Sequence, residues 1–210
     1  MSEQPQRVWV FIDSQNVYRD ARRAFHGERD PARCGQIDPR RLADLLTERG
    51  PEDDPRARLL TSARVYTGAP GAREPRAHSA HMRQRAAWER SGVEVRARPL
   101  RYPTDWPQSP AVEKGVDVSL AVDLVFAAAR RSFDVGIVLS TDTDLVPALE
   151  AVCELRRAWG EPRLEVASWG PTKKRLRVKG FPVWCHWLQS ADYEQVRDLN
   201  DYASDRGRRI

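Results

Sequence analysis

The sequence predicts one α/β domain of three layers, in which helices cover both faces of a mostly parallel sheet. Two observations support this prediction. Short apolar runs alternate with longer amphipathic segments along most of the 210 residues, and such alternation indicates βαβ units with parallel strands and right-handed crossovers. Several of the runs are also apolar without interruption, as expected of strands that are buried on both faces. We therefore expect a three-layer α/β/α sandwich.

The individual elements follow from these patterns and from their flanking residues. Residues 8–12 form the first apolar run, and Asn16 is the predicted cap of the helix after it. Asp38 and Pro39 open a second helix, which Gly50 and Pro51 stop. The predicted strands are residues 8–12, 59–66, 93–98, 135–140, 164–169 and 183–188, and the predicted helices are residues 16–25, 40–48, 78–90, 116–131, 145–159 and 191–200.

The domain organisation that we expect is simple. Residues 1–190 should form the α/β domain, and residues 191–210 should add a C-terminal helix and a frayed basic tail. Between two predicted elements, residues 101–112 hold three prolines and Trp106, which indicates a stiff surface loop. For Trp106, packing within this loop competes with stacking on an unpaired base.

Composition excludes several classes of protein. No apolar run approaches the ~20 residues of a membrane-spanning helix, and the first residues lack the apolar core of a signal peptide, so we expect a cytoplasmic protein that does not bind membranes. The three cysteines are far apart and form no Cys-x-x-Cys. Cys185 and His186 are predicted to pack in the core. The sequence has no Gly-x-Gly-x-x-Gly after the first predicted strand and no Gly-Lys-Ser/Thr, so nucleotide binding has little support.

Positive charge is distributed unevenly along the chain. The net charge is +5, but residues 64–101 hold nine arginines and three glutamates, and residues 171–180 hold five basic residues and no acid. Such local excess suits a polyanion, because contacts to phosphates release counterions. A solvated surface on an arginine-rich protein is the competing interpretation.

Carboxylates follow the two most hydrophobic predicted strands. Asp13 ends the first, and Asp142 and Asp144 come just after the fourth. In an open α/β sheet, ligands bind at the carboxyl ends of strands where the winding reverses. If these two strands are neighbours, Asp13 and Asp142 face one another there. Asp117 should join them from the first turn of a helix. Three such carboxylates would repel one another unless they share a hard cation, Mg²⁺ or Mn²⁺.

Some of the polar residues have a structural alternative. Asp144 and Asn16 could each be a helix cap rather than a catalytic residue, and Asp123 could make a buried polar contact. His78 and His81 lie on one helix face, where a solvated or RNA-facing surface competes with metal binding.

Three motifs together resemble the NYN domain family, a branch of the PIN-like nuclease superfamily. They are Val-Phe-Ile-Asp-Ser-Gln-Asn-Val-Tyr at residues 10–18, Glu-Lys-Gly-Val-Asp-Val-Ser-Leu-Ala-Val-Asp at residues 113–123, and Asp-Val-Gly-Ile-Val-Leu-Ser-Thr-Asp-Thr-Asp-Leu-Val-Pro at residues 134–147. Their order and spacing match the family over residues 8–188. The sequence departs from the family pattern at Thr141, where a glycine is common, and at Gln15, where a small residue is frequent. A β-branched residue disfavours positive φ, so the turn before Asp142 could differ.

The resemblance implies a PIN-like fold and metal-dependent hydrolysis of RNA phosphodiester bonds. It implies Asp13, Asp117 and Asp142 as the ligands of one or two Mg²⁺ or Mn²⁺ ions, with Asn16 and Asp144 in support. It also implies that Lys114 contacts the substrate phosphate.

Flanking phosphates of single-stranded RNA would be held by both basic regions, residues 64–101 and residues 173–179, and the second includes Lys173, Lys174 and Arg175. A homodimer is possible. The first alternative is an RNA-binding or partner-docking module that holds a structural ion and does not cut. A nucleotide-sugar transferase, which Asp142-x-Asp144 would suit, and an aspartyl phosphatase are weaker alternatives.

Overall fold

A six-stranded sheet forms the centre of the computed structural model, which describes residues 4–27, 29–52 and 54–204. The strands lie in the order β3-β2-β1-β4-β5-β6, and every neighbouring pair is parallel. Their bounds are β1 (Gln6–Asp13), β2 (Arg58–Ala69), β3 (Glu94–Pro99), β4 (Val135–Leu139), β5 (Arg163–Trp169) and β6 (Trp184–Leu188). All six are strands that the sequence predicts, and the sheet is entirely parallel.

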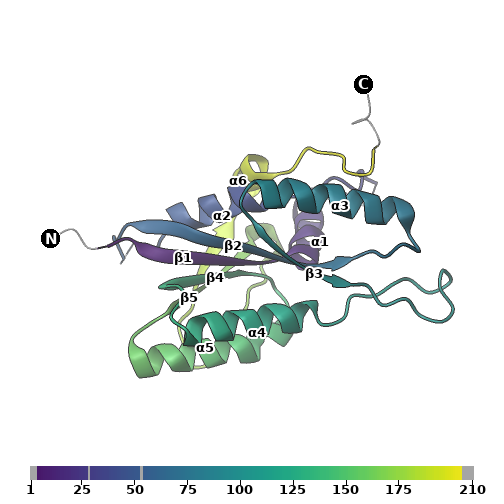
Figure 1. Cartoon of the computed structure of the whole chain (residues 1–210). Helices are drawn as coiled ribbons and strands as arrows, with labels where there is room; N and C mark the ends of the chain where they lie inside the picture. Colours follow the sequence, from purple (N-terminus) through teal and green to yellow (C-terminus); the bar gives the residue numbers. More distant parts are fainter. Residues whose placement is uncertain (1–3, 28, 53, 205–210) are drawn as a thin grey trace.

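Helices cover both faces of this sheet (Figure 1). On one face lie α1 (Ser14–Phe25), α2 (Pro39–Glu48), α3 (Pro75–Arg90) and α6 (Ser190–Val196), and on the other lie α4 (Val116–Ala129) and α5 (Val146–Trp159). Two short 3-10 helices, η1 (Thr143–Leu145) and η2 (Gly170–Thr172), follow the ends of β4 and β5. The predicted three-layer α/β/α architecture is therefore confirmed.

Each face of the sheet carries its own core. Along β1, Val8, Val10 and Ile12 pack toward α1 and α2, whereas Trp9 and Phe11 pack toward α4 and α5. Successive side chains of a strand point to opposite faces, so one uninterrupted apolar run supplies both cores. Phe11 has no exposed surface, and its burial alone stabilises the fold by about 2–3 kcal/mol.

The N-terminal caps differ in one place from expectation. Asp38 caps α2 as predicted, and its Oδ1 accepts hydrogen bonds from the backbone N–H groups of Arg40 and Arg41 at 2.9 and 3.2 Å. The prediction that Asn16 caps α1 is wrong, because Asp13 occupies that position and Asn16 lies within the helix. The chain passes from β1 to α1 without a loop, so the last residue of the strand becomes the cap.

Helix ends also shift by a few residues. Helix α3 begins at Pro75, which suits a first turn because proline has no N–H to satisfy there. Helix α4 ends at Ala129, and Arg131 has φ of 53°, outside the helical region. Helix α6 ends at Val196 rather than at residue 200. Of the predicted tail, residues 205–210 lie outside the described residues. Within the described part of the chain, no helix combines the length and the apolar character needed to cross a membrane.

Candidate active site

The winding of the sheet reverses between β1 and β4. From β1 the chain adds β2 and β3 on one side and then returns to add β4, β5 and β6 on the other. The carboxyl ends of β1 and β4 therefore border the crevice where open α/β sheets bind their ligands. Ser140 follows β4, and its hydroxyl donates a hydrogen bond to Asp13 Oδ2 at 3.0 Å across 127 positions of sequence. The loop that holds Asp142 thus lies against the end of β1.

Asp13 is a buried carboxylate with acidic neighbours. Its side chain accepts the capping hydrogen bond from the backbone N–H of Asn16 at 3.2 Å, and the residue is only 8% exposed. The pKa of Asp13 is raised to about 6, mainly by burial and in smaller part by the negative charges of Glu113 and Asp142, while the two hydrogen bonds oppose the rise. Any cation that approached this group would relieve the cost of its buried charge.

Asp142 is held by the turn that follows β4. Its Oδ1 accepts from the backbone N–H of Asp144 at 3.0 Å, and its own N–H donates to the Ser140 hydroxyl at 3.1 Å. Asp142 therefore caps η1, which precedes α5. The interpretation of Asp144 as the cap of the following helix is wrong, because Leu145 occupies the N-cap position of α5 and Asp142 that of η1. Asp144 is exposed beside it.

Asn16 connects α1 to this same turn. Its Oδ1 accepts a hydrogen bond from the backbone N–H of Thr141 at 2.9 Å, and the Thr141 hydroxyl donates to Asp20 Oδ2 at 2.6 Å. Thr141 is not among the described residues with positive φ, so the β-branched side chain is compatible with the turn. Asn16 positions the loop before Asp142, and its amide oxygen is engaged in doing so.

Sequence reasoning did not single out Glu113, although its charge acts on Asp13. Glu113 Oε1 accepts a hydrogen bond from the backbone N–H of Gly68, at the end of β2, at 2.7 Å. Burial raises the pKa of Glu113, Arg19 opposes this rise, and Asp117 adds to it. The signal was present, because Glu113 lies four positions before Asp117 in the same motif.

Two glycines permit this arrangement. A Cβ atom on Gly68 would lie 2.5 Å from Glu113 Oε1, so only glycine lets the carboxylate reach the backbone there. Gly115 has φ of 73° at the N-terminal cap of α4, a conformation that other residues rarely adopt. The chain turns at Gly115 between Glu113 and Asp117, and this turn sets both carboxylates at the start of α4.

Asp117 and Asp123 on α4 have different surroundings. Asp117 lies in the first turn, at the same sheet edge as Asp13. Asp123 lies further along the helix, where its Oδ2 accepts a hydrogen bond from the Tyr66 hydroxyl at 3.0 Å and pairs with Arg64 at 3.7 Å. Asp123 therefore makes a polar contact, as one interpretation expected, but its side chain is half-buried rather than buried.

The carboxylates suit a hydrated cation better than a cage of protein ligands. Among residues 4–27, 29–52 and 54–204, no three His, Cys, Asp or Glu side chains already form a cluster that could hold a metal ion. The available donors are all oxygens, and Mg²⁺ keeps several waters and needs only one or two carboxylates besides substrate phosphates. The raised pKa of Asp13, next to Glu113 and Asp142, indicates the position where a cation would be stabilised.

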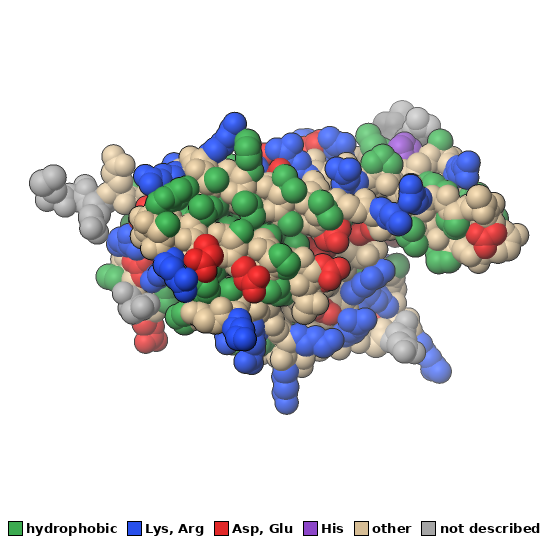
Figure 2. Space-filling view, turned by 90° about the horizontal axis from the view of Figure 1, so that it is seen from below, with side chains coloured by type: hydrophobic (Ala, Val, Ile, Leu, Met, Phe, Trp, Pro, Cys, Tyr) green, Lys and Arg blue, Asp and Glu red, His purple; other side chains and the backbone are tan. Residues whose placement is uncertain are grey.

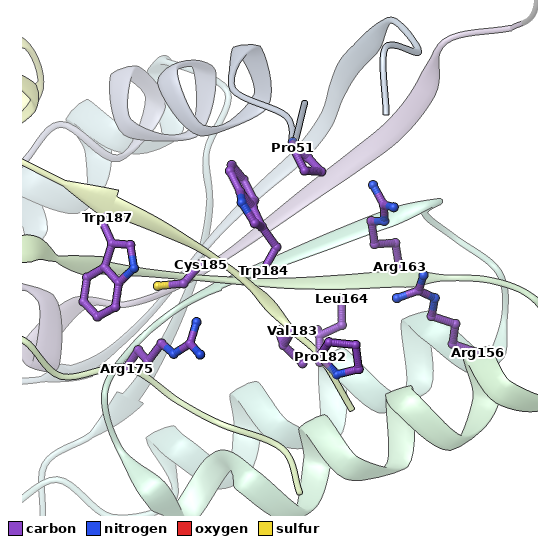
Figure 3. Close-up of a pocket in the computed structure, with 10 residues that line it drawn as sticks. All are labelled: Pro51, Arg156, Arg163, Leu164, Arg175, Pro182, Val183, Trp184, Cys185 and Trp187. Atoms are coloured by element: carbon purple, nitrogen blue, oxygen red, sulfur yellow. The ribbon is translucent and has the colours of Figure 1, made fainter. Parts of the chain in front are cut away.

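The predicted phosphate contacts are spread over two places. Lys114 is exposed directly after Glu113, and Lys173 follows η2 at the end of β5, on the same edge of the sheet as the carboxylates. Lys174 is exposed beside it. Arg175 is half-buried and lines a separate cavity (Figure 3).

That cavity lies beside the edge strand β6 and has a volume of about 500 Å³. Its lining combines three arginines and two tryptophans, which are Arg156, Arg163, Arg175, Trp184 and Trp187 (Figure 3). Its lining includes none of the carboxylates described above. Chemically it suits a phosphate and a planar ring.

The remaining candidates take structural roles. Cys185 is buried, which raises its pKa to about 11, and His186 Nε2 shares a hydrogen bond with Glu165 at 2.9 Å, so their predicted packing in the core is confirmed. Trp106 packs edge-to-face against Tyr102 with ring centroids 5.6 Å apart. His78 Nδ1 contacts the backbone oxygen of Pro70 at 2.8 Å.

Comparison with known proteins identifies a family for this arrangement. The family model described as "NYN domain" matches residues 7–160. No curated protein matches the chain. Among solved structures, a protein of unknown function from Vibrio parahaemolyticus RIMD 2210633 is similar with a TM-score of 0.52 and 18% sequence identity, covering 80% of this chain and 85% of that one. At this identity the likeness concerns the fold alone.

Proposed function

This chain belongs to the NYN domain family of PIN-like nucleases, and from this premise we propose that it is a metal-dependent ribonuclease that hydrolyses the phosphodiester bonds of single-stranded RNA. One observation carries the proposal. Asp13 is buried at the switch point of the sheet, where the charges of Glu113 and Asp142 help to raise its pKa to about 6. Perturbed carboxylates in such a crevice are characteristic of functional sites.

We propose that Asp13, Asp117 and Asp142 hold one or two Mg²⁺ or Mn²⁺ ions, and that Glu113, which precedes α4 and is bonded to the end of β2, contributes to the site. When bound, such an ion would supply positive charge to the scissile phosphate and make an attacking water more acidic. Asp144, exposed beside Asp142, would orient that water.

Two residues of the chain position these carboxylates. Ser140 fixes the Asp13 carboxylate through its hydroxyl. Asn16 holds the turn before Asp142 through the backbone of Thr141. Their roles in the proposed reaction are therefore to preorganise the site, since carboxylates that are already in place need no rearrangement when the substrate arrives.

The RNA strand would be held by the basic residues of the same sheet edge. Lys114 would contact the scissile phosphate, and Lys173 and Lys174 would contact its neighbours. Arg175 would extend this path toward the cavity beside β6, where Trp184 and Trp187 could stack on unpaired bases. Each phosphate contact that is removed should lower the salt dependence of RNA binding.

Cleavage of labelled single-stranded RNA tests the proposal. Purified protein is incubated with Mn²⁺, with Mg²⁺ or with EDTA, alongside Asp13→Asn and Asp142→Asn. We expect cleavage only with the divalent ions and its loss in both variants, by a factor of about 10³ or more, because charge stabilisation by the metal would be removed. Asp44→Asn, an exposed partner of Arg40 on α2, is the matched control and should cut normally. Undiminished metal-dependent cleavage by Asp13→Asn would refute the assignment.

A second candidate function is an RNA-binding module that holds a structural ion and does not cut. The finding that favours it is the cavity beside β6, whose arginines and tryptophans suit RNA but whose lining holds no carboxylate. The same experiment separates the two, because the binding module would bind the labelled RNA in every condition and leave it whole. Binding without cleavage at millimolar Mn²⁺ would favour this second function.

The extent of the domain and its association state are also proposals. We propose that the nuclease domain comprises residues 1–190, since β6 completes the sheet beyond the matched family region, and that residues 191–210 form a C-terminal addition.

For a homodimer, the candidate surface is the outer side of α4, where Val118, Val122 and Phe126 are 59%, 60% and 54% exposed. Hydrophobic side chains gather over this layer in Figure 2. Sedimentation of Val122→Glu against the parent chain tests it.

A further inference from the structure

A second cavity, of about 300 Å³, opens directly beside the carboxylates. Its lining includes Ser14, which follows Asp13 in the chain, and Glu113, whose negative charge contributes to the raised pKa of Asp13. The remaining walls come from α1, α3 and the segment before α2, with Tyr18, Trp88 and Gln36 among them. A pocket of this volume is at the lower end of the range for small ligands, and it adjoins the proposed site of hydrolysis.

Two polar atoms of this lining are buried without a partner. Trp88 is 6% exposed, and its indole Nε1 donates to no acceptor among the described residues. Gln36 Oε1 is also buried and accepts from no donor there. Buried polar groups are satisfied in the great majority of cases, and those that are not call for an explanation. Both residues line the cavity, so a ligand seated there is a candidate source of the complementary donor and acceptor.

The chemistry of the lining points to a nucleobase. Half of the lining residues carry aromatic rings or neutral amides, namely Tyr18, Trp88, Gln15, Gln36 and Gln84, and the lining contains no lysine or arginine. A phosphate would find no positive charge there and would meet the carboxylate of Glu113. A base has two apolar faces for the rings and an edge of donors and acceptors for the amides.

The cavity is also preformed. The Tyr18 hydroxyl donates to the backbone oxygen of Ala32 at 2.8 Å, which fixes the ring in the wall. Trp88 packs in the core of its face with Val17 and Val65. Rings that are already in place lose little conformational freedom when a ligand binds, and this favours recognition.

We propose that this cavity binds the unpaired base next to the scissile phosphate and thereby sets the base preference of the enzyme. The inference rests on the proposed ribonuclease function, which places an RNA strand across Asp13. Trp88 Nε1 and Gln36 Oε1 read the edge of the base. The substrate class is therefore single-stranded RNA with a preferred base at one position.

Binding by the Asp13→Asn chain in EDTA tests this without requiring cleavage. The probes are fluorescent ten-nucleotide single-stranded RNAs in which one abasic nucleotide is moved along the strand, read by anisotropy. We expect one position at which the abasic nucleotide weakens binding about tenfold, the effect of losing one stacked base. At that position the four bases should differ in affinity by about threefold or more.

Second-site variants in the same background identify the cavity as the cause. Trp88→Phe removes the indole N–H but keeps a ring, and Gln36→Leu removes the acceptor, so each should abolish the preference among bases. Trp159→Phe on α5 and Gln108→Leu in the proline-rich loop are the matched controls and should keep it. If Trp88→Phe does not fold, Gln36→Leu carries the test, since Gln36 lies in a loop before α2 and its substitution leaves the core unchanged.

The outcomes separate the two proposals. A flat abasic scan, or a preference that survives both Trp88→Phe and Gln36→Leu, overturns the base pocket even when the intact chain cuts RNA. A preference among bases at one position that is lost in both variants supports the pocket, even when the intact chain cuts no RNA. In that case only the nuclease proposal fails.

Discussion

Asp13 is subject to opposing influences on its pKa. Its capping hydrogen bond and its bond from Ser140 favour the carboxylate, but burial outweighs them and raises the pKa from 3.8 to about 6. The unfolded chain therefore releases this proton at lower pH than the folded chain. As pH rises from about 4 to 6, ionisation favours the unfolded state, so the free energy of unfolding falls over that window and stays lowered above it.

We predict from this that Asp13→Asn raises the free energy of unfolding in EDTA at pH 7.5. The gain should be up to about 3 kcal/mol, because each unit of pKa shift corresponds to about 1.4 kcal/mol, and an amide can still accept the bond from Asn16. Urea unfolding measures it, and at pH 4 the gain should vanish. Asp44→Asn should change little at either pH. A stability of Asp13→Asn at pH 7.5 equal to that of the parent would contradict the burial of a charge.

A prediction about Gly68 follows from its contact with Glu113. A Cβ atom there would lie 2.5 Å from Glu113 Oε1 and from Leu100 Cδ2, so Gly68→Ala must displace the carboxylate. We expect RNA cleavage to fall about tenfold or more and the free energy of unfolding to fall by about 1–3 kcal/mol. Gly71→Ala, whose Cβ would meet Tyr102 at an ordinary 3.5 Å, is the control. Unchanged cleavage by Gly68→Ala would exclude Glu113 from the site.

At the scale of elements, the strands were predictable and their connections were less so. Uninterrupted apolar runs identified β1 and β4 because each is buried on both faces. The cap of α1 was misassigned to Asn16, because sequence does not show that β1 passes into α1 without a loop. The position of Glu113 was overlooked because its hydrogen-bond partner, Gly68, lies on β2, 45 residues earlier in the chain. The elements themselves could be predicted from the sequence, but the contacts between them could not.

One ion network links elements at the opposite edge of the sheet from the carboxylates. Arg58 at the start of β2 donates to both oxygens of Glu165 on β5, at 3.1 and 2.7 Å, and His186 on β6 completes the group. All three are nearly or fully buried. Burial opposes the ionisation of Glu165, yet its bonds to His186 and Arg58 lower its pKa. The pKa of His186 is lowered by burial. Both shifts remove stability as pH falls, below about 6.5 for His186 and below about 4.5 for Glu165.

We predict that Arg58→Met lowers the free energy of unfolding by about 3–5 kcal/mol at pH 7, because it leaves Glu165 buried without a guanidinium partner. Thermal or urea unfolding measures the loss. Arg40→Met, which removes the exposed pair with Asp44, should cost less than about 1 kcal/mol. A double variant Arg58→Met with Glu165→Leu should recover much of the loss, and its failure to do so would mean that packing, not the unpaired charge, is responsible.

For the whole molecule, strand order explains why distant residues meet. The sheet reverses its winding between β1 and β4, and this reversal brings Ser140 within 3.0 Å of Asp13 Oδ2. The alternation of strands and helices predicts a parallel sheet, but many strand orders satisfy it. The order found sets the two most hydrophobic strands, β1 and β4, side by side with their carboxyl ends adjacent. The local sequence thus indicates the candidate residues, and the strand order brings them together into one site.

The whole fold should therefore respond to the ion that this site is proposed to hold. An ion that binds only the folded chain stabilises it by about 2.7 kcal/mol at one hundred times its Kd, which corresponds to a rise in Tm of about 5–10 °C for a chain of this length. We expect Mn²⁺ or Mg²⁺ to raise the Tm of the parent chain in this way and to leave Asp13→Asn nearly unchanged, although that variant starts from a higher Tm in EDTA. Differential scanning calorimetry across ion concentrations measures both curves.

Asp44→Asn should follow the parent chain, because its exposed carboxylate lies on α2 with Arg40. Equal shifts in the parent chain and in Asp13→Asn would mean that the ion binds elsewhere, and the carboxylates at the switch point would then need another explanation for their proximity.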